Sequence, residues 1–190
     1  MNKQILTALQ ALEGRERCLI AIDGCCASGK TTLAASLADQ LGCPVLHMDD
    51  YVIPHREKTP ERLALPGGNA DVERFNREVT RPWLEGKALT CQAYSCREDR
   101  LLEPVTLPES RFLIVEGCYC LHPEIPLPWD LRLFLRISPE EQRRRILLRN
   151  GEEGLKRFLE RWIPLEEAYF SAFRLPDEGC LAIRNEAESS

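Results

Sequence analysis

Residues 24–31 have the sequence GCCASGKT and match the pattern G-x-x-x-x-G-K-[ST] of a phosphate-binding loop (Walker A) at every position. The apolar run from Cys18 to Ile22 comes just before the loop and predicts a buried strand. Residues 32–41 follow it and place Leu33, Leu37 and Leu41 on one face of a predicted helix. Strand, glycine loop and helix in this order are the context that the motif requires. The sequence therefore predicts a loop that binds a nucleotide.

The backbone of this loop explains its chemistry. Gly24 and Gly29 allow the loop to wrap closely around a polyphosphate, while successive N–H groups and the helix N-terminus supply a fixed positive potential. We expect Lys30 to reach the outer phosphates and the Thr31 hydroxyl to ligate Mg²⁺, which makes ATP and Mg²⁺ the predicted cofactors. The predicted nucleotide-binding residues are Gly24, Cys25, Cys26, Ala27, Ser28, Gly29, Lys30, Thr31 and Thr32.

Length, charge and hydropathy limit the classes of protein to consider. A chain of 190 residues predicts one domain over residues 1–190. A net charge of −5 argues against nucleic acid as a partner, because there is no basic surplus to neutralise phosphates. Nothing resembles a signal peptide or a membrane span, so we expect a cytoplasmic protein that does not bind membranes. Whether it forms a homodimer stays open.

Nine cysteines are many for a cytoplasmic chain of this length. Their number is odd and none of them has C-x-x-C spacing. Several fall in predicted strands or in the phosphate loop itself. We therefore expect reduced thiols packed as small hydrophobic side chains, rather than a disulfide framework or a zinc site.

The rest of the chain alternates predicted strands and helices. Strands are expected at residues 44–48, 112–115, 131–137 and 180–183, and helices at 1–16, 71–86, 139–150 and 155–172. Residues 53–70 indicate an irregular loop, 88–108 a β-hairpin and 185–190 a frayed end. This order predicts the α/β class, with a three-layer P-loop NTPase fold: a parallel five-stranded sheet, helices on both faces, a small β-hairpin and a helical lid.

Three finer details of these elements can also be predicted. Asp71 is expected to cap the helix 71–86, and Ser138-Pro139-Glu140-Glu141 to form the capping box of the next helix. Pro164 is expected to kink or divide the helix 155–172. Arg132 and Arg136 indicate that the strand 131–137 is less central than the strand 112–115.

Asp49 comes directly after the second predicted strand. In a doubly wound sheet, ligands lie beyond the carboxyl ends of the strands, so Asp49 is expected to face the transferred phosphate opposite the phosphate loop. A carboxylate there can accept the proton of a hydroxyl group and align its oxygen with the γ-phosphorus. Asp50 is the alternative for this role. The structural alternative is a helix cap or a solvated loop carboxylate.

Glu116 ends the most apolar predicted strand, where ATPases keep a carboxylate near Mg²⁺. Aspartate is the usual residue there, so glutamate is a departure that would act through water or as a second carboxylate. Thr31 and Glu116 are the predicted metal ligands, and the alternative for Glu116 is a surface charge at a strand end.

Arg145 and Arg149 are four residues apart on the helix 139–150 and share one of its faces. A guanidinium group that closes over a phosphoryl group neutralises charge in the transition state. Arg149, beside the Asn150-Gly151 hinge, is the predicted lid cation. The alternative is a solvated charged face.

A phosphate loop by itself indicates only nucleotide binding. The sequence has no N-K-x-D guanine signature, no D-x-x-G switch at the third strand and no L-S-G-G-Q transporter signature. A short chain with a carboxylate after the second strand and late cationic helices is typical of phosphate transfer to a small acceptor. The predicted catalytic residues are Asp49, Lys30 and Arg149.

With these features together, the chain resembles the uridine kinase and phosphoribulokinase group of P-loop kinases, which includes nicotinamide riboside kinases. The matching segments are residues 22–32, 47–51, 66–71 with 74–75, Tyr94, 115–117 and 149–150. The resemblance implies a lid at about 139–174 and an acceptor-binding insertion at about 51–108. It also implies that Asp49 activates a ribose 5′-hydroxyl and that Tyr94 lies beside the base. The implied acceptor-binding residues are Asp49, Tyr51, Asp71, Tyr94 and Arg145.

The chain also departs from this group. Uridine–cytidine kinases commonly carry a histidine a few residues after the hairpin tyrosine, where this chain has Arg97-Glu98-Asp99. A nucleoside is the first expectation for the acceptor, and nicotinamide riboside, pantothenate or a sugar are the alternatives. An ATP-binding regulator that is not a kinase is the alternative from a different class.

Overall fold

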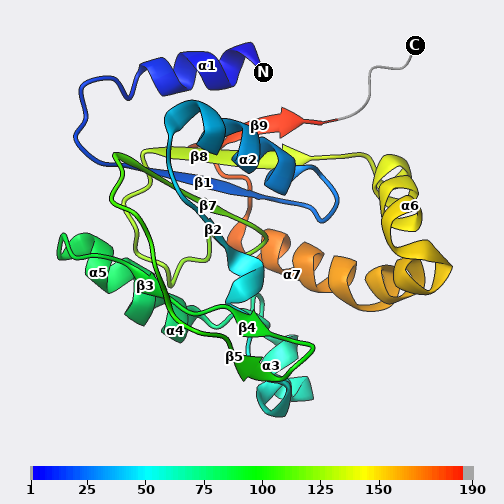
Figure 1. The fold of residues 1–190 in the computed structure, drawn as a ribbon. Coiled ribbons are helices and arrows are strands. Elements are labelled where there is room, and N and C mark those ends of the chain that lie inside the picture. Colours follow the sequence, from blue (N-terminus) through cyan, green and yellow to red (C-terminus); the bar gives the residue numbers. More distant parts are fainter. Residues whose placement is uncertain (1, 186–190) are drawn as a thin grey trace.

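Five parallel strands form the centre of the molecule, in the order β2-β7-β1-β8-β9 (Figure 1). The structure is a computed structural model that describes residues 2–185. The strands are β1 (Cys18–Gly24), β2 (Val45–His47), β7 (Phe112–Glu116), β8 (Leu131–Arg136) and β9 (Leu181–Arg184). The predicted α/β class and five-stranded parallel sheet are confirmed.

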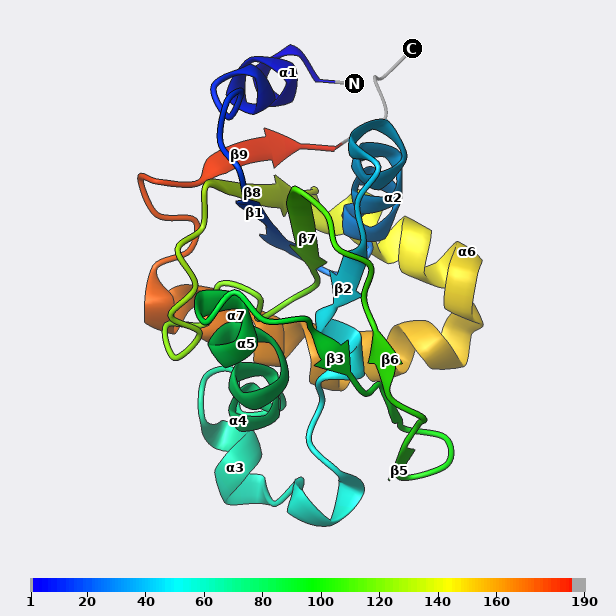
Figure 2. The same ribbon diagram turned by 60° about the vertical axis from the view of Figure 1, so that its left-hand side comes forward.

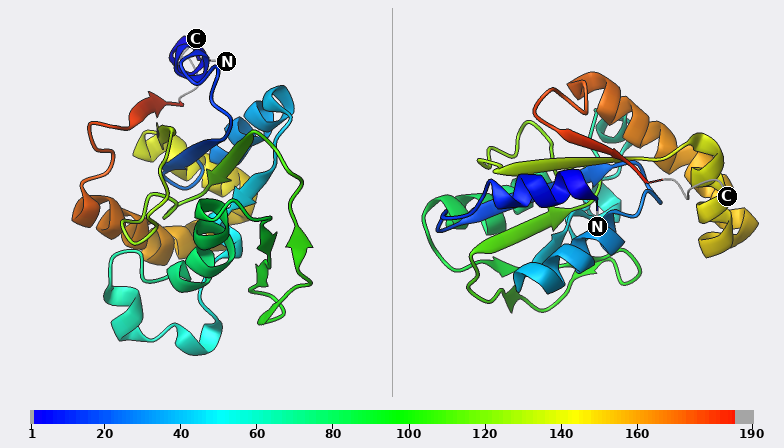
Figure 3. Two further views of the ribbon diagram at one scale, coloured as in Figure 1. Left: turned by 90° about the vertical axis from the view of Figure 1, so that its left-hand side faces the viewer. Right: turned by 90° about the horizontal axis from the view of Figure 1, so that it is seen from above.

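Helices cover both faces of this sheet. Along β1, Ile20 and Ile22 pack on one face and Leu19 and Ala21 on the other, as the two-residue period of a strand requires. The first face is covered by α1 (Lys3–Gln10) and α2 (Lys30–Leu41), and the second by α7 (Ile163–Phe173) with α4 (Val72–Phe75) and α5 (Arg81–Leu84) (Figures 1 and 3). Because β1 is buried on both faces, it reads as a continuous apolar run.

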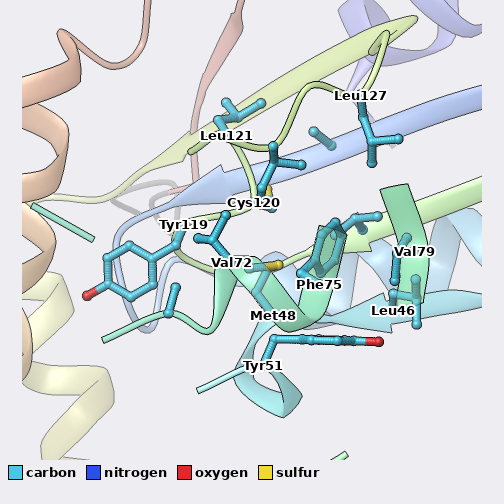
Figure 4. Close-up of a cluster of buried hydrophobic side chains, with 14 of the residues drawn as sticks. Leu46, Met48, Tyr51, Val72, Phe75, Val79, Tyr119, Cys120, Leu121 and Leu127 are labelled. Atoms are coloured by element: carbon cyan, nitrogen blue, oxygen red, sulfur yellow. The ribbon is translucent and has the colours of Figure 1, made fainter. Parts of the chain in front are cut away.

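The core on the second face fixes the segment that follows β2. Tyr51 packs edge-to-face on Phe75, with their ring centroids 5.0 Å apart, and both rings are fully buried (Figure 4). Residues 119–121, which follow β7, pack into the same cluster. The backbone that carries Asp49 therefore has a packed core directly behind it.

The predicted helix 71–86 is confirmed, and its inward side chains are buried as expected. The side chain of Asp71 accepts a hydrogen bond from the Arg74 N–H at 3.0 Å. Between α4 and α5 the helix widens into one π-helical segment, Asn76–Thr80. The predicted hairpin follows as two antiparallel ladders, β3 (Thr90–Cys91) with β6 (Val105–Thr106), and β4 (Tyr94–Ser95) with β5 (Arg100–Leu101) (Figure 2).

Two predictions need correction. The first helix ends at Gln10 rather than near residue 16, and Leu6 is 41% exposed rather than part of its buried stripe. The stretch 53–70 contains two short helices, His55–Glu57 and α3 (Pro60–Ala64), besides irregular chain. Thr59 caps α3, and Pro60 follows it at the start of the helix. This helix-start pattern was overlooked because the stretch is rich in proline.

Strand β8 lies between β1 and β9, and its two ends are less buried than β7, which is buried along its whole length. Its arginines are accommodated because Arg132 forms an ion pair with Asp177 at 2.7 Å, while Arg136 is an exposed residue at the strand end. The strand that carries the arginines is therefore the less buried of the two, as expected.

The predicted lid segment consists of α6 (Pro139–Arg157), a π-helical segment (Phe158–Trp162) and α7. The Ser138 hydroxyl accepts the Glu141 N–H at 3.4 Å, which confirms the predicted cap. Gly151, at the predicted hinge, breaks the helical dihedrals with a φ of 68°. Pro164 lies in the first turn of α7, where the π-helical segment has just ended.

All nine cysteines are free thiols, and four of them are buried. Residues 186–190, for which fraying was predicted, lie outside the described residues, whereas Asn185 donates its backbone N–H to the Arg136 carbonyl at 2.9 Å. Among the helices of residues 2–185, none combines the length and the hydropathy needed to span a bilayer.

Candidate functional site

The loop between β1 and α2 has the backbone conformation of an anion cradle. Gly24 and Gly29 have φ values of 131° and 93°, in the region that favours glycine. A Cβ atom at Gly24 would collide with the backbone of Leu135, and one at Gly29 would collide with the Asn185 amide. The backbone collision at Gly24 and the positive φ at both positions therefore favour glycine in both, and the cradle fits a polyphosphate.

Lys30 begins α2 and folds back over the loop. Its Nζ donates to the carbonyl oxygens of Gly24 and Cys25 at 2.7 and 2.9 Å. Burial acts to lower the pKa of Lys30, but the surrounding acidic groups, led by Glu166, raise it above its usual value. The lysine is therefore a fixed positive charge at the mouth of the cradle.

Thr31 and Glu116 come together as the sequence predicted. The Thr31 hydroxyl donates to Glu116 Oε1 at 3.1 Å, and His47 Nδ1 lies 2.6 Å from the same oxygen. That hydrogen bond to Glu116 raises the pKa of His47. A hydroxyl and a carboxylate are the hard oxygen ligands that Mg²⁺ prefers, so this pair fits the predicted metal.

A cavity of about 570 Å³ lies between the cradle and the lid segment. Predicted site residues from four separate parts of the chain line it, namely Lys30, Thr31, Asp49, Glu116, Arg145 and Arg149. Asp49 reaches it from the short helix Met48–Asp50 at the end of β2. Asp50 is not among the lining residues, and its carbonyl accepts a hydrogen bond from Arg74 Nη2 at 2.7 Å.

Two lid arginines line the cavity in different ways. Arg145 Nη1 donates to the Ala27 carbonyl at 3.3 Å, and its Nη2 donates to the Asn185 carbonyl at 2.7 Å. Within residues 2–185, the hydrogen bond of the Arg149 side chain is local, from Nε to Asn150 Oδ1 at 2.8 Å. Arg145 is thus anchored to the phosphate loop, whereas Arg149 is exposed and is held only within the lid.

Three residues that the resemblance implied as acceptor contacts do not line this cavity. The ring of Tyr51 is buried in the core and its hydroxyl donates to Glu78 Oε2 at 3.3 Å. Asp71 caps α4, and the Tyr94 hydroxyl bonds to the Asp99 carboxylate while it accepts the backbone N–H of His55. In this structure these side chains make contacts within the segment 51–108, and their role as acceptor contacts stays a prediction.

Glu166 and Gln142, which were not predicted from the sequence, bind the loop from the lid side. Glu166 Oε2 accepts the Cys26 N–H at 2.8 Å, and Gln142 Nε2 donates to the Cys26 carbonyl at 3.0 Å. Glu166 is three residues before Tyr169 and four after Trp162, both in the predicted apolar stripe. An acidic residue on an inward helical face was the signal that could have revealed it.

Asp23 joins three elements behind the loop. Its carboxylate accepts the N–H groups of Gly24 and Leu121 at 2.7 and 3.0 Å and the Tyr169 hydroxyl at 2.9 Å. Complete burial raises the pKa of Asp23, and these hydrogen bonds partly oppose the rise. The residue fixes the end of β1 against α7 and the chain after β7.

Glu166 is a further buried acid of the site, beside Asp23 and Glu116. Burial raises its pKa to about 7, and Lys30 and the Cys26 N–H oppose this rise. A carboxyl group that titrates near neutral pH therefore lies beside the phosphate loop.

The family model described as AAA domain (AAA_18) matches residues 20–167, well over half of the chain. None of the curated protein sequences compared matches this chain. The solved structures similar to it include a possible uridine kinase from Bacillus stearothermophilus, with 21% identity and a TM-score of 0.67. That match covers 94% of this chain and 95% of the other.

Two further solved structures have the same fold. A candidate fructose transport system kinase from Silicibacter sp. TM1040 has 24% identity and a TM-score of 0.71, over 94% of this chain and 97% of the other. YFH7 from Saccharomyces cerevisiae has 12% identity and a TM-score of 0.66, over 97% and 99% of the two chains. The chain therefore belongs to the AAA_18 family and has the fold of the uridine kinase-like P-loop kinases.

Proposed function

We propose that this protein is an ATP-dependent kinase that transfers the terminal phosphoryl group of ATP to a hydroxyl group of a small acceptor. One observation carries the proposal: Asp49 lines the same cavity as Lys30 and Thr31. A nucleotide-binding switch needs the cradle alone, whereas phosphoryl transfer to an alcohol also needs a group that orients the acceptor hydroxyl. The fold shared with kinases supports this choice.

The cradle residues 24–32 would hold the phosphates, and Thr31 and Glu116 would hold Mg²⁺. When bound, Mg²⁺ neutralises charge on the phosphate oxygens. Lys30 would exchange its two hydrogen bonds to loop carbonyls for phosphate oxygens. Since those carbonyls lie at the loop itself, the ammonium group needs only a small movement to do so.

Asp49 would accept the hydroxyl proton of the acceptor and align its oxygen with the phosphorus. Its side chain is exposed to the cavity, so an acceptor can reach it. Arg149 would close over the phosphoryl group, because its guanidinium is exposed and has no bond to the loop. Arg145 would stabilise the loop and contact the transferred group from its anchored position.

A nucleoside, phosphorylated at its ribose 5′-hydroxyl, is the first candidate for the acceptor. The resemblance of residues 47–51 and 115–117 to uridine kinases supports it, as does the fold shared with a possible uridine kinase. We assign the lid to about 139–174 and the acceptor-binding insertion to about 51–108. Nicotinamide riboside, pantothenate and sugars are the alternative acceptors. The nine free thiols favour the reducing cytoplasm as the compartment.

The test is a screen of acceptors for stimulated release of ADP from ATP and Mg²⁺. Nucleosides, nicotinamide riboside, pantothenate and sugars are each added to the wild-type protein. We expect one class to raise ADP release and to appear as its phosphate ester. Slow hydrolysis that no small molecule stimulates, but that a macromolecule does, would instead support an ATP-binding regulator.

A further inference from the structure

Glu166 places a carboxylate oxygen where a phosphate loop is expected to hold phosphate oxygens. Its Oε2 accepts the backbone N–H of Cys26 at 2.8 Å, from inside the loop sequence. Only 8% of Glu166 is exposed, and the residue lines the same cavity as Lys30. Loop N–H groups are the donors with which such a cradle binds anions. One of these donors is therefore already occupied by an anion of the protein itself.

Charged and titratable groups surround Glu166 from several elements. Lys30, which begins α2, provides the main positive charge beside it, and Asp23 of β1 provides a second negative one. The thiols of Cys26 and Cys118 and the Tyr119 hydroxyl face the same group from the loop and from the chain after β7. Lys30 is therefore the cation that chiefly balances Glu166 and Asp23, while the cavity is also lined by the carboxylates of Asp49 and Glu116 and by the cations Lys58, Arg145 and Arg149.

We propose that Glu166 is an internal substitute for a phosphate oxygen in the cradle, and that an incoming nucleotide must displace it from the Cys26 N–H. The inference rests on the proposed function only for the identity of the nucleotide, ATP. A phosphate oxygen and a carboxylate cannot both accept the one N–H, and at close range in a buried site their charges repel. Glu166 therefore has to move away or take up a proton when ATP binds.

The position of Glu166 connects this displacement to the lid. It lies in the first turns of α7, directly after the segment Phe158–Trp162, and both Phe158 and Trp162 line the cavity. That segment continues from α6, which carries Arg145 and Arg149 (Figure 1). A shift of α7 that frees the Cys26 N–H thus moves the chain that leads to the lid arginines. Release of Glu166 is the step that couples phosphate binding to the lid.

The experiment measures the Kd of Mg·ATP by isothermal titration calorimetry for wild type, Glu166→Gln and Glu167→Gln. Glutamine keeps an acceptor for the Cys26 N–H but removes the charge. Glu167 is exposed on the same helix and serves as the matched control. At pH 8 we expect Glu166→Gln to bind on the order of ten-fold more tightly than wild type, since a like charge has been removed from the site. Glu167→Gln should bind as wild type does.

At pH 6, Glu166 of the wild type is largely protonated, so the gap between wild type and Glu166→Gln should nearly close. The ratio of the two proteins at each pH cancels the titration of ATP itself and of His47 and Asp23. Glu166→Ala removes both the charge and the acceptor, and it should also bind more tightly at pH 8. It supplies the second test if the glutamine variant does not fold.

Equal or weaker binding by Glu166→Gln and Glu166→Ala at pH 8 would overturn the inference and leave a structural role for Glu166. That outcome leaves the proposed kinase function intact as long as wild type binds ATP. Failure of wild type and of all variants to bind ATP would instead defeat the proposed function together with the inference.

Discussion

The two sides of the cavity differ in how their residues are held. On the cradle side, the loop has glycines with positive φ, accepts hydrogen bonds from Lys30 and Gln142, and donates the Cys26 N–H to Glu166. On the acceptor side, Asp49 reaches the cavity, but Tyr51 and Tyr94 point into contacts within their own segment. The nucleotide side is built from backbone, and the acceptor side from side chains on loops.

This difference explains why the cradle side already has the arrangement that binds phosphate when no nucleotide is bound. Backbone N–H groups in a fixed loop need no rearrangement to bind an anion. Side chains on a segment of short helices and two-residue ladders can change partners at the cost of a few hydrogen bonds. We therefore expect the acceptor side to tolerate substitutions that the cradle side does not, with Asp49 as its exception.

The largest effect is expected at Asp49. Asp49→Asn removes the proton acceptor and should lower kcat by roughly 10²–10⁴-fold, while the Kd of ATP stays near the wild-type value. Steady-state kinetics with the acceptor found in the screen, together with ATP titration, measure the two effects. Asp50→Asn is the neighbouring comparison, and a loss of kcat there with Asp49→Asn unaffected would move the role to Asp50.

On the cradle side, Lys30→Ala should weaken ATP binding and lower kcat together, by on the order of 10²–10³-fold in kcat. Lys30 supplies the positive charge that balances the phosphates. Without it, neither the affinity for ATP nor kcat can keep its wild-type value. Calorimetry and kinetics on the same preparation test this expectation. Lys87→Ala, an exposed lysine paired with Glu85 at 2.7 Å, is the control. Wild-type ATP affinity in Lys30→Ala would contradict the assigned role.

A third prediction concerns stability. Burial raises the pKa of Glu166 from 4.5 to about 7. Below pH 4.5 the group is protonated in both the folded and the unfolded chain and costs nothing. As pH rises from 4.5 to 7, the unfolded chain ionises this group while the folded chain keeps it protonated, so the free energy of unfolding falls by about 3 kcal/mol in full. The free energy of unfolding of Glu166→Gln relative to wild type should therefore increase from pH 5 to pH 8.

Urea unfolding of both proteins at pH 5, 6, 7 and 8 measures this difference. Subtracting wild type from Glu166→Gln removes the contributions of Asp23 and His47, which titrate in both. A difference that stays constant over this range would show that Glu166 does not titrate near neutral pH.

The smallest effect is expected on the acceptor side. Tyr94→Phe removes the hydroxyl that joins Asp99 to the His55 N–H, and it should cost about 1 kcal/mol of stability. Because that hydroxyl does not line the cavity, the KM of the acceptor should change by less than about two-fold. Thermal unfolding and steady-state kinetics separate the two effects. A ten-fold rise in KM without loss of stability would restore Tyr94 to the acceptor site.

The same contrast separates what could be predicted from the sequence and what could not. The loop, its two glycines, Lys30 and the meeting of Thr31 with Glu116 follow from a motif whose spacing is set by backbone geometry. The sheet follows from apolar runs with a two-residue period. These features are local in the sequence or depend on the one rule that parallel strands end at a common edge.

The features that escaped prediction depend on tertiary contacts. Glu166 reaches Cys26 across 140 residues, and no local pattern states that α7 packs under the loop. The ion-pair partner of Arg132, Asp177, is likewise distant in sequence. The Tyr94 hydroxyl bonds to Asp99 within a hairpin whose turn residues fit many arrangements.

The deciding measurement uses ATP with a radioactive γ-phosphate, in the presence of Mg²⁺ and each acceptor in turn. It determines which product carries the radioactive phosphate. We expect wild type to place the label on the hydroxyl of one acceptor class, and Asp49→Asn, with ATP still bound, to place almost none there. Label found only in inorganic phosphate, or transfer by Asp49→Asn at the wild-type rate, would contradict the role given to the cavity between Lys30 and Asp49.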